Sequence, residues 1–545
     1  MISNKIIEKE FFMELVYLWV EDYKNIQKQG FNFSPNFDVK FKPVYENERL
    51  SDKSELKITP KENPLKDFFD KDINITAIVG ENGSGKSSVL EILAEIFRIE
   101  FNKNKNLIVD DTHTFDFFLT FKMKNKNYEI KSINRHDTNT FNNDEKIENI
   151  LDYYVYSNDR EIKNQFLFDN TSIAQMLVYD YSQNKNFKLS SFMYLPNKIE
   201  IRLCDFEMKF EKLISNDKLY PMYKNKSNRD YIKNTSDEQQ TQIESFEKIN
   251  NDKYFQFLIL KLLENSKETH DFYLTKEEIQ EKLTTQNIEY VSESDFNLYF
   301  NISNEPLNRI EKEVNELAVE EKTIYINKFS DFFEFDFIDE LNRRYNDLSH
   351  GEKTLFGQLL NIYYNSQKSK NDNLLFLFDE PELSLHPQWQ KNYINEIYNL
   401  VEKFGKNYHF IITSHSPFLL SDLPKENIIF LEKGKQVYPF ENGQTFGANI
   451  HTLLSHGFFM KDGLMGEFAK SKIDDVIKYL NNDKKSTITT DKDAQNIINI
   501  IGEPIIKREL QRMLDSKRLS KIDKIDEIEK QIEELQKELK KIKND

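Results

Sequence analysis

A short glycine-rich run contains the residues best suited to phosphate chemistry. It comprises Gly80, Glu81, Asn82, Gly83, Ser84, Gly85, Lys86, Ser87 and Ser88. The chain has only 14 glycines, and none follows this run until Gly351. Glycine allows a backbone to bend sharply and to approach a ligand closely. The run matches GxxxxGK[ST], a loop whose N–H groups hold phosphates. The pattern predicts Lys86 on the phosphates and Ser87 on Mg²⁺.

Two adjacent carboxylates follow a second informative stretch. The apolar residues Leu374–Phe378 precede Asp379 and Glu380. An apolar strand that ends in such a pair fits a Walker B element, in which Asp379 would bind Mg²⁺ through water. Glu380 would orient or deprotonate the attacking water. The alternative is a solvated strand end without chemistry, and the phosphate loop upstream favours the functional interpretation.

Two other patterns come later in the chain. The run Leu348-Ser349-His350-Gly351-Glu352 gives Ser349 and Glu352 the spacing of a capping box, so a helix is expected to begin there. The positive end of that helix would face a phosphate, and Gly351 would allow a close approach. His415 ends a short apolar strand that begins at Phe410. His386 could contact a partner's site or simply end a turn.

The elements around these residues are predicted from their hydrophobic patterns. Ile73–Val79 is expected to be a buried strand and Ser87–Phe97 a helix, which places the glycine run at a strand-to-helix turn. Strands are expected over Glu14–Phe41 and a loop over Tyr45–Asp70. Helices are expected over Ile243–Asn265, Thr275–Leu283 and Asn304–Ala318, the second with a capping box from Thr275 to Glu278.

Four segments follow from this reading of the chain. Residues 1–205 would form the first part of an ATPase head and 326–475 its second part. Residues 206–325 would be a mostly helical insertion, and 476–545 a helical C-terminal region. Apolar residues at alternating gaps of three and four form a seam from Ile525 to Ile542. This seam would pack on its own chain or mediate self-association.

Composition limits the function classes. The chain has 545 residues and a net charge of −17, so a generally basic coat for nucleic acid is not expected. Cys204 is the only cysteine, which excludes an intrachain disulfide and a cysteine zinc cluster. No apolar run approaches the length of a membrane span. We therefore expect a cytoplasmic protein that makes no membrane contact.

The order of these motifs resembles that of ABC-type ATPases. The LSHGE run resembles their signature, and the strand before His415 resembles their switch-histidine element. The resemblance implies an α/β ATPase head with a P-loop central sheet, flanking helices and an antiparallel β lobe. It further implies ATP and Mg²⁺ as cofactors, with His415 on the γ-phosphate. Ser349, Gly351 and Glu352 would face nucleotide on a second copy, in a head-to-head dimer or a higher oligomer built from dimers.

Further stretches resemble the ATPase subunit of Septu-type antiphage systems, which is similar to ATPases of some retron operons. They are the opening run Leu15–Lys24 and the segments Thr445–Leu454 and Gly457–Ala469. The resemblance implies a nucleotide-controlled sensor and scaffold for a separate HNH endonuclease. DNA, or a retron RNA–DNA, is an open partner of that complex.

Some alternatives remain. One rival class is the OLD-type nuclease with a TOPRIM domain, for which Asp491 and Asp493 supply a metal-binding spacing, but in a polar stretch. Another is a repair ATPase of SMC or RecF type that acts directly on DNA. The Q-loop could lie at Ser157-Asn158 or at Gln165. The aromatic residues that could stack on adenine are Phe31, Phe33 and Phe37.

Overall fold

The computed structural model describes most of the chain. The described residues are 14–46, 49–51, 53–61, 68–103, 117–123, 126–133, 137–140, 151–157, 166–182, 194–203, 252–265, 274–288, 290, 292–299, 309–319, 333–440, 443–457 and 465–544. The chain divides into two compact units, Met1–Leu453 and Leu454–Asp545. The boundary expected after residue 475 instead falls inside a helix, α16 (Glu467–Leu480).

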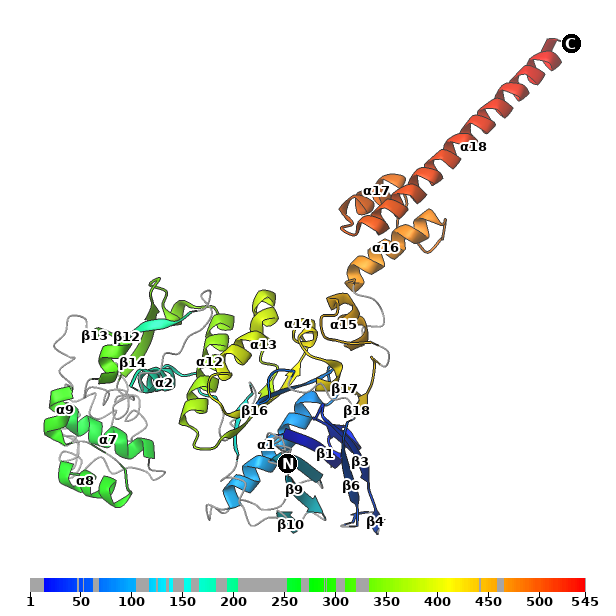
Figure 1. The fold of residues 1–545 in the computed structure, drawn as a ribbon. Coiled ribbons are helices and arrows are strands. Elements are labelled where there is room, and N and C mark those ends of the chain that lie inside the picture. The colour runs from blue at the N-terminus through cyan, green and yellow to red at the C-terminus, as the bar shows by residue number, and fades with distance from the viewer. Residues whose placement is uncertain are drawn as a thin grey trace, which may run out of the picture. The chain divides into compact units, whose positions relative to one another are not determined.

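A mostly parallel sheet forms the centre of the larger unit (Figure 1). In sheet order its strands are β11 (Asp152–Tyr156), β15 (Asn373–Asp379), β16 (Asn407–Ser414), β7 (Ile73–Gly80), β17 (Ile428–Glu432) and β18 (Lys435–Val437). Each neighbouring pair is parallel except the last. The carboxyl ends of parallel strands meet at one edge, where ligands of such sheets commonly bind.

The sequence of these strands explains their burial. The apolar residues of β15 and β16 are almost wholly inaccessible, and Phe376 stacks on Phe410 across the two strands with ring centroids 5.1 Å apart. A strand covered on both faces can be apolar throughout. Helix α1 (Lys86–Lys103) follows β7 and buries Val89, Leu93 and Ile96 in the same core. The predicted strand and helix around the glycine run are confirmed.

A second, antiparallel sheet shares that core. Its strands in order are β10 (Asp137–Thr140), β9 (Lys126–Ile133), β8 (Phe117–Met123), β1 (Glu14–Tyr23) and β2 (Ile26–Asn32). Leu15, Leu18 and Phe31 of this sheet belong to one buried cluster with Ile78 and Leu377 of the parallel sheet. The expected fold class, an α/β head with an antiparallel lobe, is therefore observed.

The loop expected over Tyr45–Asp70 is partly wrong. The small strands here are β3 (Phe37–Lys42), β4 (Tyr45–Glu46), β5 (Arg49–Leu50) and β6 (Glu55–Pro60). Strand β6 pairs antiparallel with β3 and leaves most of its residues partly or fully exposed. Its polar composition hid it, because a strand that is mostly solvated needs few apolar residues.

The helix expected over Asn304–Ala318 is also partly wrong. A third sheet has the order β13 (Arg309–Glu313), β12 (Pro196–Leu203) and β14 (Phe333–Asp339). Among the residues described in the expected segment, only α10 (Val314–Val319) is helical. Pairing with β12, over a hundred residues earlier, decides this conformation. The helices described within 206–325 also include α7 (Lys253–Asn265), α8 (Lys276–Thr285) and α9 (Glu293–Tyr299). The capping box from Thr275 to Glu278 is confirmed.

Helices surround the sheets of the larger unit and make up the smaller one. Besides α1 and α7 to α10, the larger unit contains α2 (Asn170–Ser182), η6 (Tyr345–Asp347), α12 (His350–Lys368), α13 (Pro387–Val401), α14 (Pro417–Ser421), η7 (Lys425–Asn427) and α15 (Ile450–Gly457), whose last residues pass into the smaller unit. In the smaller unit, α16, α17 (Asp491–Ile500) and α18 (Pro504–Asn544) share one apolar cluster. Among the described residues, no helix has both the length and the apolar character that crossing a bilayer requires.

Candidate nucleotide-binding site

The glycine run forms a tight turn between β7 and α1. Gly83 and Gly85 have φ values of +74° and +106°, in the left-handed region that favours glycine. A Cβ on Gly80 would lie 2.2 Å from the carbonyl oxygen of Leu431, so that position also requires glycine. The loop therefore needs its glycines for conformation and for close packing, and it leads directly into the N-terminus of α1.

Lys86 lies at the centre of the loop with its side chain turned back. Its Nζ donates to the carbonyl oxygens of Gly80 and Glu81, at 3.1 and 3.0 Å. Burial lowers the pKa of Lys86, while the carboxylates of Glu380, Asp379 and Glu382 act in the opposite direction. The loop carbonyls and nearby carboxylates thus stabilise a buried cation, which an incoming phosphate could also bind.

Ser87 and Asp379 bring two oxygen donors together across the sheet edge. The Ser87 hydroxyl donates to Oδ1 of Asp379 at 3.0 Å, and the Thr413 hydroxyl donates to the same oxygen at 2.6 Å. Thr413 Oγ1 in turn accepts from the backbone N–H of Glu380 at 3.0 Å. Hydroxyl and carboxylate oxygens are the donors that Mg²⁺ prefers. The chemistry of this pair therefore fits the ion that the motif implies.

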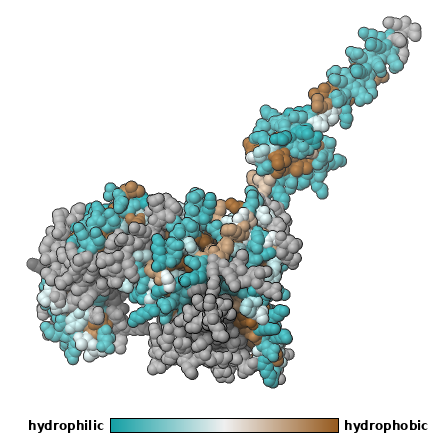
Figure 2. Space-filling view, viewed as in Figure 1, coloured by the Kyte–Doolittle hydropathy of each residue, from teal (hydrophilic) through white to brown (hydrophobic). Residues whose placement is uncertain are grey.

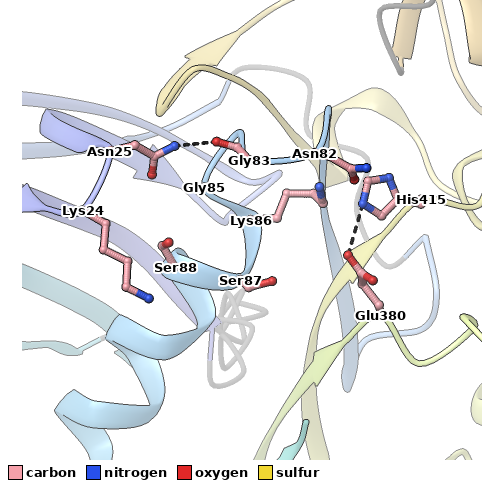
Figure 3. Close-up of a pocket in the computed structure, with 10 residues that line it drawn as sticks. All are labelled: Lys24, Asn25, Asn82, Gly83, Gly85, Lys86, Ser87, Ser88, Glu380 and His415. Carbon is pink, nitrogen blue, oxygen red and sulfur yellow. Dashed lines mark hydrogen bonds and ion pairs between the residues drawn. The ribbon is translucent and has the colours of Figure 1, made fainter. Parts of the chain in front are cut away.

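Glu380 and His415 face one another from neighbouring strand ends (Figure 3). The Oε1 of Glu380 lies 3.1 Å from Nε2 of His415. Glu380 has a φ of +47°, an unfavourable conformation for a residue with a Cβ and one that is often found at functional sites. The hydrogen bond to His415 is the main cause that lowers the pKa of Glu380. Glu380 is therefore an ionised carboxylate positioned to accept a proton.

A buried carboxyl that the sequence reasoning missed supports this pair. Oε1 of Glu382 accepts from the Ser414 hydroxyl at 2.6 Å and from the backbone N–H of His415 at 2.8 Å. Glu382 is only 3% exposed, and burial raises its pKa. The residues around Glu382 in the sequence do not indicate this contact. Glu382 fixes the backbone of His415 relative to the end of β15.

A cavity of about 370 Å³ opens beside the loop. Its lining residues are Lys24, Asn25, Asn82, Gly83, Gly85, Lys86, Ser87, Ser88, Glu380 and His415. Eight of these were predicted as site residues. The predicted residues Gly80, Glu81, Ser84 and Asp379 support the loop or contact Ser87 without lining the cavity themselves.

Lys24 and Asn25, at the turn between β1 and β2, were missed as site residues. The Asn25 side-chain amide donates to the carbonyl oxygen of Gly83 at 2.7 Å, and Lys24 forms an ion pair with Glu91 of α1. The backbone N–H of Gly434 donates to Ser84 O at 2.9 Å. Two turns from different strands therefore hold the glycine loop. The positive φ of Lys24, +54°, marks a tight turn, but no sequence motif identified it.

The predicted signature begins α12. Ser349 is its N-cap: its hydroxyl accepts from the N–H of Glu352, and the Glu352 carboxylate accepts from the backbone N–H of Ser349 at 3.0 Å. A Cβ on Gly351 would lie 2.5 Å from Ser384 O, so close packing requires this glycine. The predicted capping box is confirmed. In the part of the chain that is described, none of these three residues lines the cavity.

The adenine candidates are wrong. Phe31, Phe33 and Phe37 are at most 1% exposed, so none has a free ring face. Of the Q-loop candidates, Asn158 and Gln165 lie outside the described residues, whereas Ser157 follows β11.

His386 and Asp491, one of the two aspartates considered for the rival TOPRIM class, have local structural roles. His386 is the N-cap of α13, where its Nδ1 accepts from the N–H of Gln388. Asp491 accepts from the Tyr479 hydroxyl at 2.6 Å and pairs with Lys521. Among the described residues, no group of three or more His, Cys, Asp or Glu side chains is arranged to hold a metal ion.

Comparison with known proteins relates this chain to other ATPases. A family model for the AAA ATPase domain matches residues 17–420. The Retron Ec83 probable ATPase of Escherichia coli is 35% identical over 96 residues, which cover 16% of this chain and 17% of that protein. The Retron Vc95 probable ATPase of Vibrio cholerae serotype O1 biovar El Tor is 29% identical over 120 residues, covering 20% of this chain and 22% of that protein. Each alignment thus spans less than a quarter of the curated relative.

Two solved structures also show a remote likeness. The recombination mediator protein RecF with ATP gives a TM-score of 0.28 at 13% identity, over 79% of this chain and 100% of that one. The SMC head bound to the C-winged helix domain of ScpA gives a TM-score of 0.24 at 12% identity, over 78% and 96%.

Proposed function

The chain belongs to the AAA ATPase domain family, and from this premise we propose that it binds ATP with Mg²⁺ and hydrolyses it. The observation that carries this proposal is the meeting of three strand ends at one cavity. They bring together Lys86 after β7, Glu380 directly after β15 and His415 directly after β16, while Asp379, the last residue of β15, contacts Ser87 of the loop. A cation, hard oxygen donors and an ionised carboxylate are the parts that phosphoryl transfer to water requires.

The loop residues would bind and orient the triphosphate. Lys86 would exchange its bonds to the loop carbonyls for bonds to phosphate oxygens, and the N-terminus of α1 would contribute its backbone N–H groups. Ser87 and Asp379 would hold Mg²⁺, which neutralises charge on the phosphates when it is bound. Asn25 and Gly434 would keep the loop in place, since both bond to it directly.

Glu380 would position and deprotonate the attacking water. Its lowered pKa keeps it ionised at neutral pH, and His415 lies within hydrogen-bond distance of its Oε1. His415 would contact the terminal phosphate and respond to its loss. Glu382 would hold the backbone of His415 so that this response depends on the geometry of the strand end.

A second copy would complete the site. Ser349, Gly351 and Glu352 begin a helix whose N-terminus could face phosphate on another chain, in a head-to-head dimer or a larger assembly of dimers. The motif order supports this arrangement. We further propose that the dimer serves an antiphage defence complex as a nucleotide-controlled scaffold for a separate HNH endonuclease; the partial identity to two retron ATPases supports the defence setting.

Turnover and binding measurements on variants test the ATPase proposal. Glu380→Gln should bind ATP as tightly as the wild type and lose about a thousandfold in turnover, because the base is removed. Lys86→Ala should lose nucleotide binding itself. Glu402→Gln, at an exposed carboxylate after α13, is the matched control and should keep full activity. Unchanged turnover in Glu380→Gln would refute Glu380 as the base.

A separate experiment tests the partner. The neighbouring open reading frame should encode an HNH protein that co-purifies with this chain, and the purified chain alone should not nick plasmid DNA with Mg²⁺ or Mn²⁺. Nicking that Asp491→Ala abolishes would assign the protein to the nuclease class instead.

A further inference from the structure

The distal part of α18, beyond the ion pair between Lys521 and Asp491, is a long exposed helix. Its first turns are anchored, because Leu510 and Leu514 are buried against α16 and α17. From residue 519 to residue 540, every residue is exposed. That stretch is about 33 Å of helix at 1.5 Å per residue. Helices in proteins gain most of their stability from the packing of an apolar face, so this one is expected to pack on something.

The exposed part carries one continuous apolar seam. The seam residues with described side chains are Ile525, Ile528, Ile532, Leu535 and Leu539, each between 47% and 60% exposed. Their spacing places Ile525, Ile532 and Leu539 at heptad position a, and Ile528 and Leu535 at position d. Figure 2 shows such apolar residues among hydrophilic ones on the surface of the C-terminal helix. A narrow a/d stripe matches a helix partner and not a flat surface.

The charges that flank the seam are complementary to those of a second copy of the same helix. Lys524 stands at position g and Glu529 at position e of the next heptad. In a parallel, in-register pair of identical helices, each g residue faces the e residue five positions on in the partner. Lys524 of each helix would therefore face the partner's Glu529, which gives two such contacts in a symmetric pair. The next such pair is Gln531 with Gln536, which is uncharged, so no like charges oppose one another in this span.

The antiparallel arrangement lacks this match. Reversing one helix makes g positions face g positions and e positions face e positions, so Lys524 and Glu529 no longer oppose each other, and this specific contact distinguishes the two orientations. We propose that residues 524–540 of α18 form a parallel two-stranded coiled coil with the same segment of a second copy of this chain. This contact needs no nucleotide and is separate from the closure of two ATPase sites.

Disulfide trapping tests the geometry. In the full-length protein with Cys204→Ser, Leu535→Cys should give a cross-linked dimer on mild oxidation without nucleotide, because identical d positions meet in a parallel pair. Lys537→Cys, at position f on the opposite side, is the matched control and should stay uncross-linked. No cross-link at 535, or equal cross-linking at 537, would overturn the proposal.

Charge exchange tests the register and the identity of the partner. Lys524→Glu and Glu529→Lys should each weaken self-association about tenfold in sedimentation, since each places like charges together twice. The double variant should recover wild-type association. If it stays as weak as the single variants, the helices are not parallel and in register with their own kind. The same measurements in a Lys86→Ala background should give the same result, which separates this contact from nucleotide binding.

Discussion

Two histidines six residues apart show how differently the middle and the end of β16 are used. His409 is wholly buried in the strand: its Nδ1 accepts from the backbone N–H of Leu15 at 3.1 Å, and its Nε2 lies 2.9 Å from the Thr76 hydroxyl. His415 follows the strand, with its side chain 33% exposed, and faces the Glu380 carboxylate. His409 joins the parallel sheet to the antiparallel sheet of β1, and His415 faces the cavity.

The difference shows that surroundings, and not residue type, set the role of a histidine. Burial lowers the pKa of His409 to about 3, so it stays neutral and acts as a fixed hydrogen-bond partner. His415 has a carboxylate partner and access to solvent, which a group that responds to phosphate needs. If this comparison is right, the two residues should affect different measurements.

The largest effect is expected at the strand end. His415→Ala should lower ATP turnover about a thousandfold, because it removes the group beside Glu380, and should leave the urea unfolding midpoint nearly unchanged. Steady-state hydrolysis tests the expected loss of turnover. Urea unfolding, monitored by the fluorescence of Trp19 and Trp389, tests the expected stability. His451→Ala, at an exposed histidine of α15, is the control. A large loss of stability would contradict the assignment of His415 to the site.

The next effect is expected in the middle of the strand. His409→Ala should lower the free energy of unfolding by about 3 kcal/mol, because it leaves a cavity and an unpaired N–H at Leu15. Turnover per folded molecule should change little at low temperature, since His409 does not line the cavity. If His409→Ala kept normal stability and lost hydrolysis, His409 would belong to the site and not to the packing of the strand.

The sequence predicted the residues at the strand ends well, but it did not predict the buried contacts within the strands. The glycine loop, the carboxylate pair and the capping box at Ser349 depend on neighbours a few residues away, so local spacing predicts them. His409 depends on Leu15, 394 residues earlier, and β13 is a strand only because β12 pairs with it. Glu382 and Asn25 act through contacts to distant backbone, which no motif encodes. The phenylalanines proposed for adenine are buried by residues far away in the sequence, which their local sequence does not show.

Glu382 lies beside the end of β16 and is itself buried. Its substitution should therefore change both stability and ATP turnover, each to an intermediate degree. Glu382→Ala removes the acceptor for the His415 N–H, an expected loss of about 2 kcal/mol and roughly 30-fold in kcat, with a smaller change in KM. Glu382→Gln keeps an acceptor oxygen and should recover most of that activity. If Gln is no better than Ala, the carboxyl does not act by holding the His415 backbone.

The smallest effect is a dependence of stability on pH. The unfolded chain protonates His409 below about pH 6.5, while the folded chain does so only near pH 3. The free energy of unfolding should therefore be greatest above pH 6.5 and fall with acidification, by up to about 1.4 kcal/mol per pH unit from this residue. His409→Gln should show a shallower decline between pH 6.5 and 5 in urea unfolding. Identical slopes in the two proteins would show that His409 is not buried as described.

The capping box of α12 has a consequence for any docking event at that helix. The N-terminus of α12 already carries an anion of its own, since the Glu352 carboxylate bonds to both the Ser349 hydroxyl and its N–H. A phosphate that arrives from outside must displace this carboxylate, so the event is an exchange of one negative group for another. Such an exchange has a small net driving force and is easily reversed. A helix start with these properties would suit the proposed dimer, in which two copies close and separate again.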